Sequence, residues 1–560
     1  MASSWRASLL FTSFVIGFVL IVGRLFYWQI ISADRLQKEA ARQHYIELTI
    51  PASRGSILDT QEHPIVVNQP AYLVYGEPRN IEHIRLFVKS IADIVGRDVE
   101  ELVSELSQPN RVWVPLAHKV EMSRVTALKA LTLAGLGFEK EPKRFYPEAS
   151  MAAHLIGFVG SDVNGVDRGY FGLEGYYDRP LRGIAGSRRL EKDANGAPIL
   201  IGEEERLVPE DGRTLVLWMD KAAQQIVEKR LKEGINRYGA KEGSVVVMDP
   251  SNGGILAMAS YPNYDPRSYA SFDKELYKNP AVGSSYEPGS TFKALIMAAA
   301  IEENVVKPDT LIDESRPIEV GPYIIRTWNN QYHGEISMTQ VLQYSSNVGM
   351  VYVAQKLGRD KLVSAIKRFG FGKLTNIDLE DEASPELRQD KDWREVDEYT
   401  ASFGQGIAIT PIQMVRAVAT LANGGKLMEP HVVREIREAG GKRIEIKPKV
   451  VQTVVSPETA RIVTEMLVNA VDNGEAKWAK PKGYRIAGKT GTAQIPVAGH
   501  YDETKTIASF VGFAPADRPR FVMLVTIREP TSSPWGSETA APLFFTIARD
   551  LFTYWGIPAQ

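Results

Sequence analysis

The stretch 286–293 reads YEPGSTFK and places a serine and a lysine three residues apart behind a turn. Pro288 and Gly289 predict the turn, and the apolar run 292–301 predicts a helix buried in a domain core. Ser290 then lies in the first turn of this helix, with Lys293 on the same face. A serine hydroxyl is a poor nucleophile without a base, and burial turns Lys293 into a candidate base because it disfavours the ammonium. An N-cap serine beside a solvated lysine is the alternative for these positions.

Two further polar motifs follow along the chain. Residues 345–347 read SSN, lie between a predicted helix at 338–344 and another apolar helix, and supply a hydroxyl and a carboxamide. Residues 489–492 read KTGT and lead into a predicted strand, where Gly488 and Gly491 permit close approach of another backbone. Three ordered motifs on a helix, a loop and a strand favour one catalytic site over three unrelated polar loops.

Composition narrows the class of protein. Since a domain typically has about 150 residues, the length of 560 residues predicts roughly three or four domain-sized units. The net charge of −2 offers no basic excess for a nucleic-acid partner. The chain has no cysteine, which excludes disulfides, thiolate metal sites and a cysteine nucleophile. With 44% hydrophobic and 24% charged residues, it has the balance of an ordinary globular chain.

One N-terminal segment departs from this average. Residues 7–22 carry no charged side chain, and 25–28 extend the apolar run. Residues 7–28 span about 33 Å as a helix, enough to cross a hydrocarbon core of ~30 Å. A cleaved signal peptide and a buried core helix are the alternatives, but bulky residues stand where cleavage needs small ones. We therefore predict an uncleaved transmembrane anchor at 7–30.

The rest of the chain is predicted to divide near residue 236. A hairpin at 243–259 opens a region that mixes strands with long helices, which predicts a single α/β or α+β catalytic domain. Within it, 378–398 holds ten acidic and three basic residues and predicts a solvated loop. The expected parts are a cytosolic tip at 1–6, the anchor at 7–30, a pedestal domain at 31–235 and the catalytic domain at 236–560.

S-x-x-K, S-x-N and K-T-G in this order are typical of penicillin-binding proteins and serine β-lactamases. The chain resembles the class B penicillin-binding proteins almost end to end, with RGSILD at 54–59, RFYP at 144–147, GLEG at 172–175 and FGQG at 403–406. Residues 60–62 depart from the usual continuation of the first of these motifs. The resemblance implies an α/β (α+β) transpeptidase domain with a central antiparallel sheet flanked by helices. It also implies an elongated mixed pedestal and one N-terminal transmembrane helix.

Segments 508–515 and 539–544 are similar to the septal, FtsI-type enzymes. This resemblance implies a serine-type peptidoglycan D,D-transpeptidase that cross-links stem peptides during cell division and is a target of β-lactams. An elongation-type class B protein, a β-lactamase or β-lactam sensor, and a catalytically silent division scaffold are the alternatives. A lactamase needs a group that activates a deacylating water, and the sequence does not identify one.

The resemblance also implies a role for each motif residue. Ser290 would attack the carbonyl of the penultimate D-Ala, Lys293 would take its proton, and Ser345 would pass a proton to the leaving amine. Lys489 would tune the site, and the backbone N–H groups of Ser290 and Thr492 would form the oxyanion hole. No metal or other cofactor is implied.

Substrate contacts are expected from the same motifs. Thr490, Gly491 and Thr492, with the charge of Lys489, suit the terminal carboxylate of the stem peptide, and Asn347 suits its peptide amide. Expected partners are stem peptides, β-lactams, a membrane-embedded FtsW-like glycosyltransferase and other division proteins, with no nucleic acid. The expected location is the inner (cytoplasmic) membrane at the division septum, single-pass, with the catalytic domain on the periplasmic or extracellular side.

Overall fold

The computed structural model describes residues 4–36, 39, 45–109, 111–162, 165–191, 204–497 and 500–559. They belong to two compact units, which are described separately. One unit comprises Met1–Ser53 with Gly183–Asp211, and the other comprises Arg54–Arg182 with Gly212–Gln560. Residues 1–3 of the expected tip lie outside the described residues.

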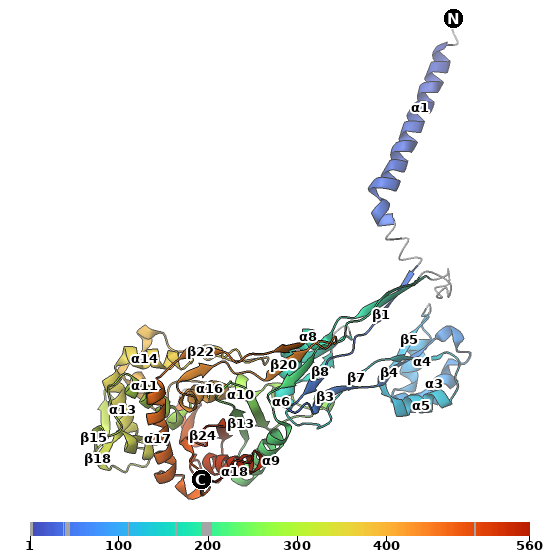
Figure 1. Cartoon of the computed structure of the whole chain (residues 1–560). Coiled ribbons are helices and arrows are strands. Elements are labelled where there is room, and N and C mark those ends of the chain that lie inside the picture. Colours follow the sequence, from blue (N-terminus) through green and yellow to red (C-terminus); the bar gives the residue numbers. More distant parts are fainter. Residues whose placement is uncertain are drawn as a thin grey trace. The chain divides into compact units, whose positions relative to one another are not determined.

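The first unit contains the apolar N-terminal helix. Helix α1 (Ser4–Phe26) continues into a π-helical turn, η1 (Tyr27–Ile31) (Figure 1). The span Trp5–Ile31 has 27 residues, and its most apolar 18-residue window has a mean hydropathy of 2.3 and is not buried. It is about 40 Å long, so it is long and apolar enough to cross a bilayer. Within the described residues, this confirms the expected single N-terminal apolar helix.

The first unit also contains a three-stranded antiparallel sheet. Its strands are, in order, β1 (Tyr45–Ile50), β10 (Gly186–Glu191) and β11 (Glu204–Leu207).

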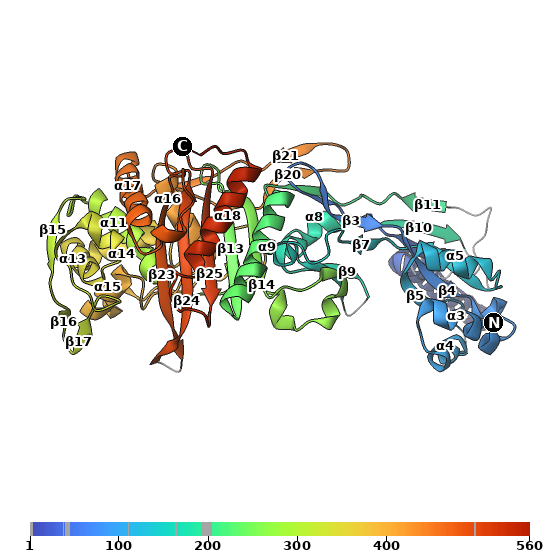
Figure 2. The ribbon, with the colours of Figure 1, turned by 90° about the horizontal axis from the view of Figure 1, so that it is seen from below.

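A five-stranded antiparallel sheet is the centre of the second unit (Figure 2). The strands are, in order, β14 (Ile255–Tyr261), β13 (Glu242–Met248), β25 (Phe521–Arg528), β24 (His500–Ala514) and β23 (Ala487–Val497). Every neighbouring pair is antiparallel. The expected hairpin, β13–β14, therefore joins strands that lie more than 200 residues later in the sequence.

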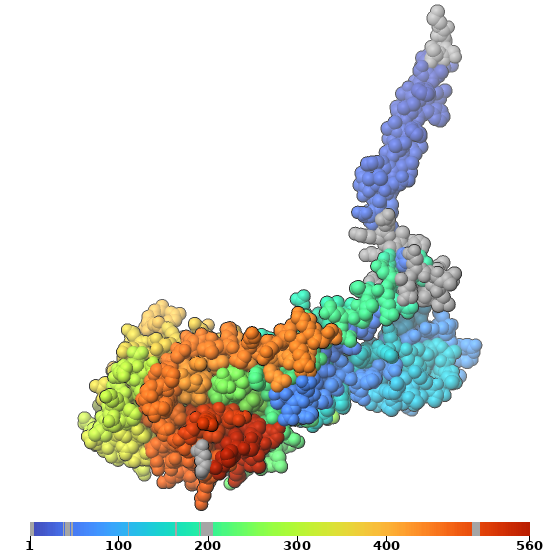
Figure 3. Space-filling model, in the orientation of Figure 1, coloured from blue at the N-terminus to red at the C-terminus, as the bar shows by residue number. Residues whose placement is uncertain are grey.

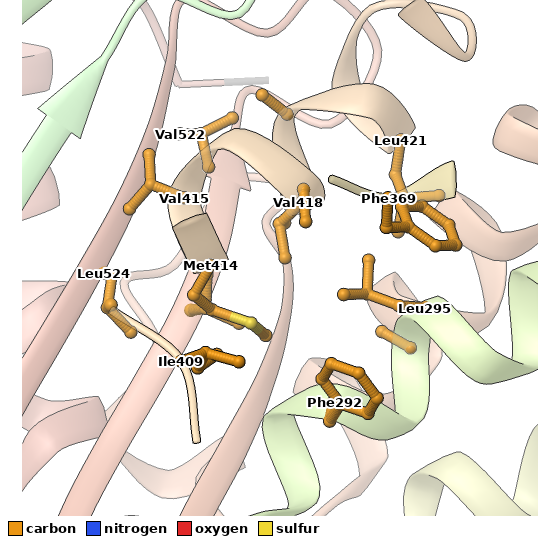
Figure 4. Packing of buried hydrophobic residues seen from close by; sticks show 14 of the residues in the cluster. Phe292, Leu295, Phe369, Ile409, Met414, Val415, Val418, Leu421, Val522 and Leu524 are labelled. Atoms are coloured by element: carbon orange, nitrogen blue, oxygen red, sulfur yellow. The ribbon is translucent and has the colours of Figure 1, made fainter. Parts of the chain in front are cut away.

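Strand β25 shows why this sheet needs cover on both faces. All of its residues except the last are buried. Because side chains alternate between the faces of a strand, Val522 and Leu524 join one hydrophobic core while Met523 and Val525 join another. Figure 4 shows Val522 and Leu524 on the side of Met414, in the first of these cores.

Helices supply that cover. Helices α9 (Lys221–Tyr238) and α18 (Ala540–Tyr554) pack together on the face of Met523 and Val525. Helices α11 (Lys293–Glu302) and α16 (Pro411–Ala422) lie in the core on the other face (Figure 4). The arrangement confirms the expected α/β (α+β) domain with a central antiparallel sheet flanked by helices.

Local signals begin these helices. Asp220 accepts the backbone N–H groups of Ala222 and Ala223 at the start of α9. Thr410 and Gln413 form a reciprocal capping box at the start of α16, where Pro411 occupies the first turn. The helices on the two faces of the sheet are therefore positioned by residues that precede them directly.

Four strands of the pedestal sequence and two strands from the C-terminal half of the chain form a second, six-stranded sheet. Its strands are, in order, β21 (Arg443–Glu445), β20 (Val433–Arg437), β12 (Thr214–Leu217), β2 (Ile57–Leu58), β3 (Pro64–Gln69) and β7 (Lys143–Phe145). Strands β20 and β21 come from the C-terminal half of the chain, so orange and blue segments lie side by side in Figure 3. The expected domain limits, including the division near residue 236, stay predictions.

A smaller subdomain follows β3 in the sequence. Its strands β5 (Val114–Glu121), β4 (Ala71–Gly76) and β6 (Leu136–Lys140) form an antiparallel sheet in that order. Helices α3 (Ile84–Val95), α4 (Val99–Leu106) and α5 (Met122–Ala130) pack against it through a separate hydrophobic core.

Buried ion pairs join the N-terminal motifs. Glu174 is completely buried, and its carboxylate accepts hydrogen bonds from the Nε–H groups of Arg54 and Arg144, each at 2.7 Å. Arg54 also donates to Asp178 at 2.8 Å. The motifs at 54–59, 144–147 and 172–175 thus meet in one network, and its carboxylate would be costly to bury without these partners.

Most acidic residues of the segment 378–398 are exposed, as expected of a solvated loop, but the first of them, Asp378, is buried and departs from that expectation. Asp378 accepts the backbone N–H groups of Val432 and Val433 at 2.6 and 3.0 Å, and the Tyr177 hydroxyl at 2.9 Å. Burial raises the pKa of the Asp378 carboxyl, while these donors oppose the rise. Composition alone misses such a site, because the donors that make the burial tolerable come from distant segments.

Candidate active site

One cavity of about 260 Å³ brings the three sequence motifs together. The motif residues that line it are Ser290, Ser345, Asn347, Thr490, Gly491 and Thr492. The lysines of the first and third motifs, Lys293 and Lys489, are buried beside them. The predicted site residues therefore converge, although their individual roles stay predictions.

The serine lies on a tight turn in front of a buried helix. Residues Gly289–Phe292 form a 3₁₀ turn, η5, that leads directly into α11. Gly289 has φ +55°, a left-handed conformation that favours glycine. The completely buried Thr291 closes the turn, because its hydroxyl donates to the Pro288 carbonyl at 2.7 Å. Ser290 itself is half-buried and faces the cavity.

Lys293 is fully enclosed and bound to the second motif. Its Nζ donates to the Ser345 carbonyl at 2.6 Å, to the Ser345 hydroxyl at 3.4 Å and to Asn347 Oδ1 at 2.8 Å. Burial, and then the charge of Lys489, hold the pKa of Lys293 well below its ordinary value, while Glu475 and Glu314 oppose the shift. A lysine with a lowered pKa is suited to accept a proton.

The second motif is a strained loop between two helices, α12 (Met338–Gln343) and α13 (Asn347–Leu357). Ser345 has φ +58°, an unusual conformation for a residue other than glycine and one that concentrates at functional sites. The Ser346 hydroxyl caps α13 by accepting the Gly349 N–H at 2.8 Å. Both ends of the Asn347 amide are bound within the protein, since its Nδ2 donates to the Arg326 carbonyl at 2.9 Å.

The third motif lies on β23, the edge strand of the central sheet. Lys489 Nζ donates to the Thr490 hydroxyl at 3.0 Å and to the Thr490 carbonyl at 3.2 Å. Burial lowers the pKa of Lys489, and Glu475 opposes this shift. The Thr492 hydroxyl accepts the Gly536 N–H at 3.0 Å, so that hydroxyl is oriented by the protein.

Glycines allow these segments to approach one another. A Cβ atom at Gly491 would lie 2.8 Å from Thr291 Cγ2 and 3.1 Å from the Pro288 carbonyl oxygen. Gly404, from the FGQG motif, has φ +80°, and a Cβ there would lie 2.2 Å from the Gly289 carbonyl oxygen. The glycines of two motifs thus pack directly against the turn that presents Ser290.

Sequence reasoning missed several residues of the cavity wall, among them Trp328, Trp535 and Glu475. Trp328 and Trp535 meet edge to face with ring centroids 4.8 Å apart, and Glu475 follows helix α17 (Pro457–Asn473). The Thr490 hydroxyl donates to Glu475 Oε2 at 3.4 Å. No motif spacing points to these residues, because they reach the cavity from separate loops.

The chain matches two protein families in succession. Residues 49–217 match the penicillin-binding protein dimerisation domain, and residues 243–551 match the penicillin-binding protein transpeptidase domain. The second match contains all the predicted site residues.

Relatives cover nearly the whole chain. Stage V sporulation protein D of Bacillus subtilis is 35% identical over 97% of this chain and 84% of its own length. Peptidoglycan D,D-transpeptidase FtsI of Escherichia coli is 31% identical over 97% of this chain and 91% of its own length. The crystal structure of penicillin-binding protein 3 of Mycobacterium tuberculosis, complexed with aztreonam, is similar with a TM-score of 0.71 and 27% identity, covering 92% of this chain and 98% of that one. The chain therefore belongs to the penicillin-binding proteins with a transpeptidase domain, as a class B member of the FtsI type.

Proposed function

We propose that this protein is a peptidoglycan D,D-transpeptidase that cross-links stem peptides through an acyl-enzyme on Ser290. The observation that supports this most directly is the convergence of the three motifs on one cavity, with two buried lysines beside it. Membership of the transpeptidase family and the naming of a relative as a D,D-transpeptidase agree with an acyl-transferring enzyme.

In the first step, Ser290 Oγ attacks the carbonyl carbon of the penultimate D-Ala and gives its proton to Lys293. The C–N bond to the terminal D-Ala then breaks, and Ser345 passes a proton to the leaving amine. The bond of Lys293 Nζ to the Ser345 hydroxyl supports this proton path. The N–H groups of Ser290 and Thr492 would stabilise the oxyanion, and losing one such donor costs about 3–4 kcal/mol of barrier.

In the second step, an amine of a neighbouring stem peptide attacks the acyl-enzyme carbonyl. Its proton returns through the same groups, and the Ser290 hydroxyl is regenerated as the cross-link forms. The Thr490 and Thr492 hydroxyls, with the Lys489 charge, would hold the terminal carboxylate of the donor peptide. The main role of Asn347 would be to orient Lys293. Asn347 Oδ1 accepts a hydrogen bond from Lys293 Nζ, and Asn347 Nδ2 donates to the Arg326 carbonyl.

We place the protein in the cytoplasmic membrane by its N-terminal helix, with the catalytic domain on the outer side, where peptidoglycan lies. Proposed partners are stem peptides, β-lactams, an FtsW-like glycosyltransferase and other division proteins at the septum. The apolar span Trp5–Ile31 and the FtsI relative support the membrane location.

Labelling with a fluorescent penicillin tests the reaction. Membranes with the wild-type protein should take up a stable covalent label, and Ser290→Ala should take up none. A wild-type protein without label would refute the acyl-enzyme and favour a silent scaffold. Rapid release of hydrolysed drug would favour a β-lactamase.

A second candidate is the same reaction at another stage of the cell cycle. The 35% identity to a protein named for sporulation favours it. A fluorescent fusion should concentrate at midcell if the septal assignment holds. Signal confined to developing spores would favour the second candidate, and uniform side-wall signal would favour an elongation role.

A further inference from the structure

Glu475 lies in the wall of the same cavity as Ser290, and none of the three motifs contains it. It is half-buried and follows the last turn of α17. Its Oε2 accepts the Thr490 hydroxyl at 3.4 Å, and that hydroxyl oxygen accepts Lys489 Nζ at 3.0 Å. Because both groups bond one oxygen, the carboxylate and the ammonium lie within roughly 6 Å of one another, a range in which opposite charges interact strongly.

Two buried lysines create an electrostatic problem at this site. Lys293 and Lys489 are 0% and 3% exposed, and two neighbouring ammonium groups would repel each other in a medium of low dielectric. The proposed acylation needs one neutral amine, which accepts the Ser290 proton. Some feature of the site must therefore decide which lysine keeps its charge.

The charged groups around the pair are few. Among the described residues that line the cavity, Glu475 is the only acidic one. Glu314, at the end of β15 (Leu311–Glu314), also acts on Lys293, but it is completely buried and accepts His333 Nδ1 at 2.8 Å. Glu475 differs from it in being linked to Lys489 through a single hydroxyl.

We propose that Glu475 is a positioning residue that assigns the charge within the lysine pair. Through Thr490 it holds the Lys489 side chain and favours the ammonium there, which leaves Lys293 as the neutral amine that accepts the Ser290 proton. This inference rests on the proposed acylation of Ser290. It agrees with the raising of the Lys489 pKa by Glu475 and with the lowering of the Lys293 pKa by the charge of Lys489, which exceeds the direct, opposing effect of Glu475 on Lys293.

The pH profile of acylation distinguishes this role from a structural one. The second-order rate constant for a fluorescent penicillin is measured from about pH 5 to pH 10 in the wild type and in Glu475→Gln. Glu475 reaches Lys489 through one hydroxyl, so without the carboxylate the ammonium of Lys489 is disfavoured more than that of Lys293. The basic limb of the bell-shaped profile should therefore move to lower pH by about one unit, and further than the acidic limb. Glu475→Asp, which keeps the charge, should restore the limbs toward their wild-type positions.

Two controls sharpen this comparison. Glu458 lies in the first turn of α17, the helix that precedes Glu475, and pairs with Arg461 in solvent. Glu458→Gln therefore removes an acidic charge that is nearby in sequence and should leave the profile unchanged. His333 contacts Glu314, which also acts on Lys293, so His333→Gln is measured in parallel. A limb that moves in His333→Gln but not in Glu475→Gln would assign the profile to histidine and overturn the inference.

The remaining outcomes are equally decisive. A Glu475→Gln profile lowered at every pH, with its limbs unmoved, would mean that Glu475 only supports the structure. If thermal unfolding shows that Glu475→Gln is not folded, the test rests on Glu475→Asp. Limbs that are displaced in Glu475→Asp, although it keeps the charge, would contradict the inference. A wild type unlabelled at every pH would overturn the proposed function itself, whereas a labelled wild type with unmoved limbs in Glu475→Gln overturns only this inference.

Discussion

Gly491→Ala tests how closely strand β23 must approach the turn that presents Ser290. The added methyl group would lie 2.5 Å from Ser509 Oγ on the neighbouring strand, 2.8 Å from Thr291 Cγ2 and 3.1 Å from the Pro288 carbonyl oxygen. Thr291 has little freedom to rotate away, because it is buried and its hydroxyl donates to Pro288 at 2.7 Å. Carbon atoms pack at about 3.5–4.0 Å, so the strand and the turn must separate by about 1 Å.

Such a displacement would move the oxyanion donors relative to each other. A misplacement of about 1 Å costs on the order of 10²-fold in rate, or about 2.7 kcal/mol of barrier. Overpacking itself costs about 1–3 kcal/mol of stability. We therefore expect Gly491→Ala to fold, with reduced stability, and to be acylated about 100-fold more slowly than the wild type.

The assay is the time course of labelling with a fluorescent penicillin, with thermal unfolding to verify the fold. Gly440→Ala is the matched control, because a methyl group at Gly440 would meet nothing within 4 Å. It should match the wild type in both measurements. A folded Gly491→Ala protein acylated at the wild-type rate would refute the argument from close approach.

Lys293→Met should slow acylation about 10²- to 10⁴-fold, the usual contribution of a general base, and wild-type labelling would contradict the assigned base. The same variant tests proton linkage: burial lowers the folded pKa of Lys293 below its unfolded value of 10.5, so between the two values the unfolded chain holds a proton that the native protein lacks, and stability rises with pH. Denaturant unfolding should show that the free energy of unfolding rises less steeply with pH in Lys293→Met than in the wild type, by at most about 1.36 kcal/mol per pH unit. Equal slopes in the two proteins would contradict the lowered pKa of Lys293. Glu174→Ala should cost about 3–5 kcal/mol in urea unfolding, because Arg54 and Arg144 lose their shared buried partner, and a loss below about 1 kcal/mol would disprove that role.

The elements that the sequence predicted well depend on local spacing. The turn at 286–293, the apolar helix behind it and the hairpin at 243–259 follow from residues a few positions apart. The N-terminal span follows from an uninterrupted apolar run. The pairing of β20 with β12 was not predictable in this way, because short strands far apart in sequence carry no local signal for their partner.

By itself, the sequence determined the motif set, the helix, loop and strand on which each motif lies, and the presence of an N-terminal apolar segment. Only the tertiary structure decided that Lys293 is bound to Ser345 and Asn347, that Glu475 reaches Lys489 through Thr490, and that Asp378 is buried. The physical reason is distance along the chain. Periodicity determines which face a side chain occupies, whereas the choice of a buried polar partner depends on packing between segments that fold together from distant parts of the sequence.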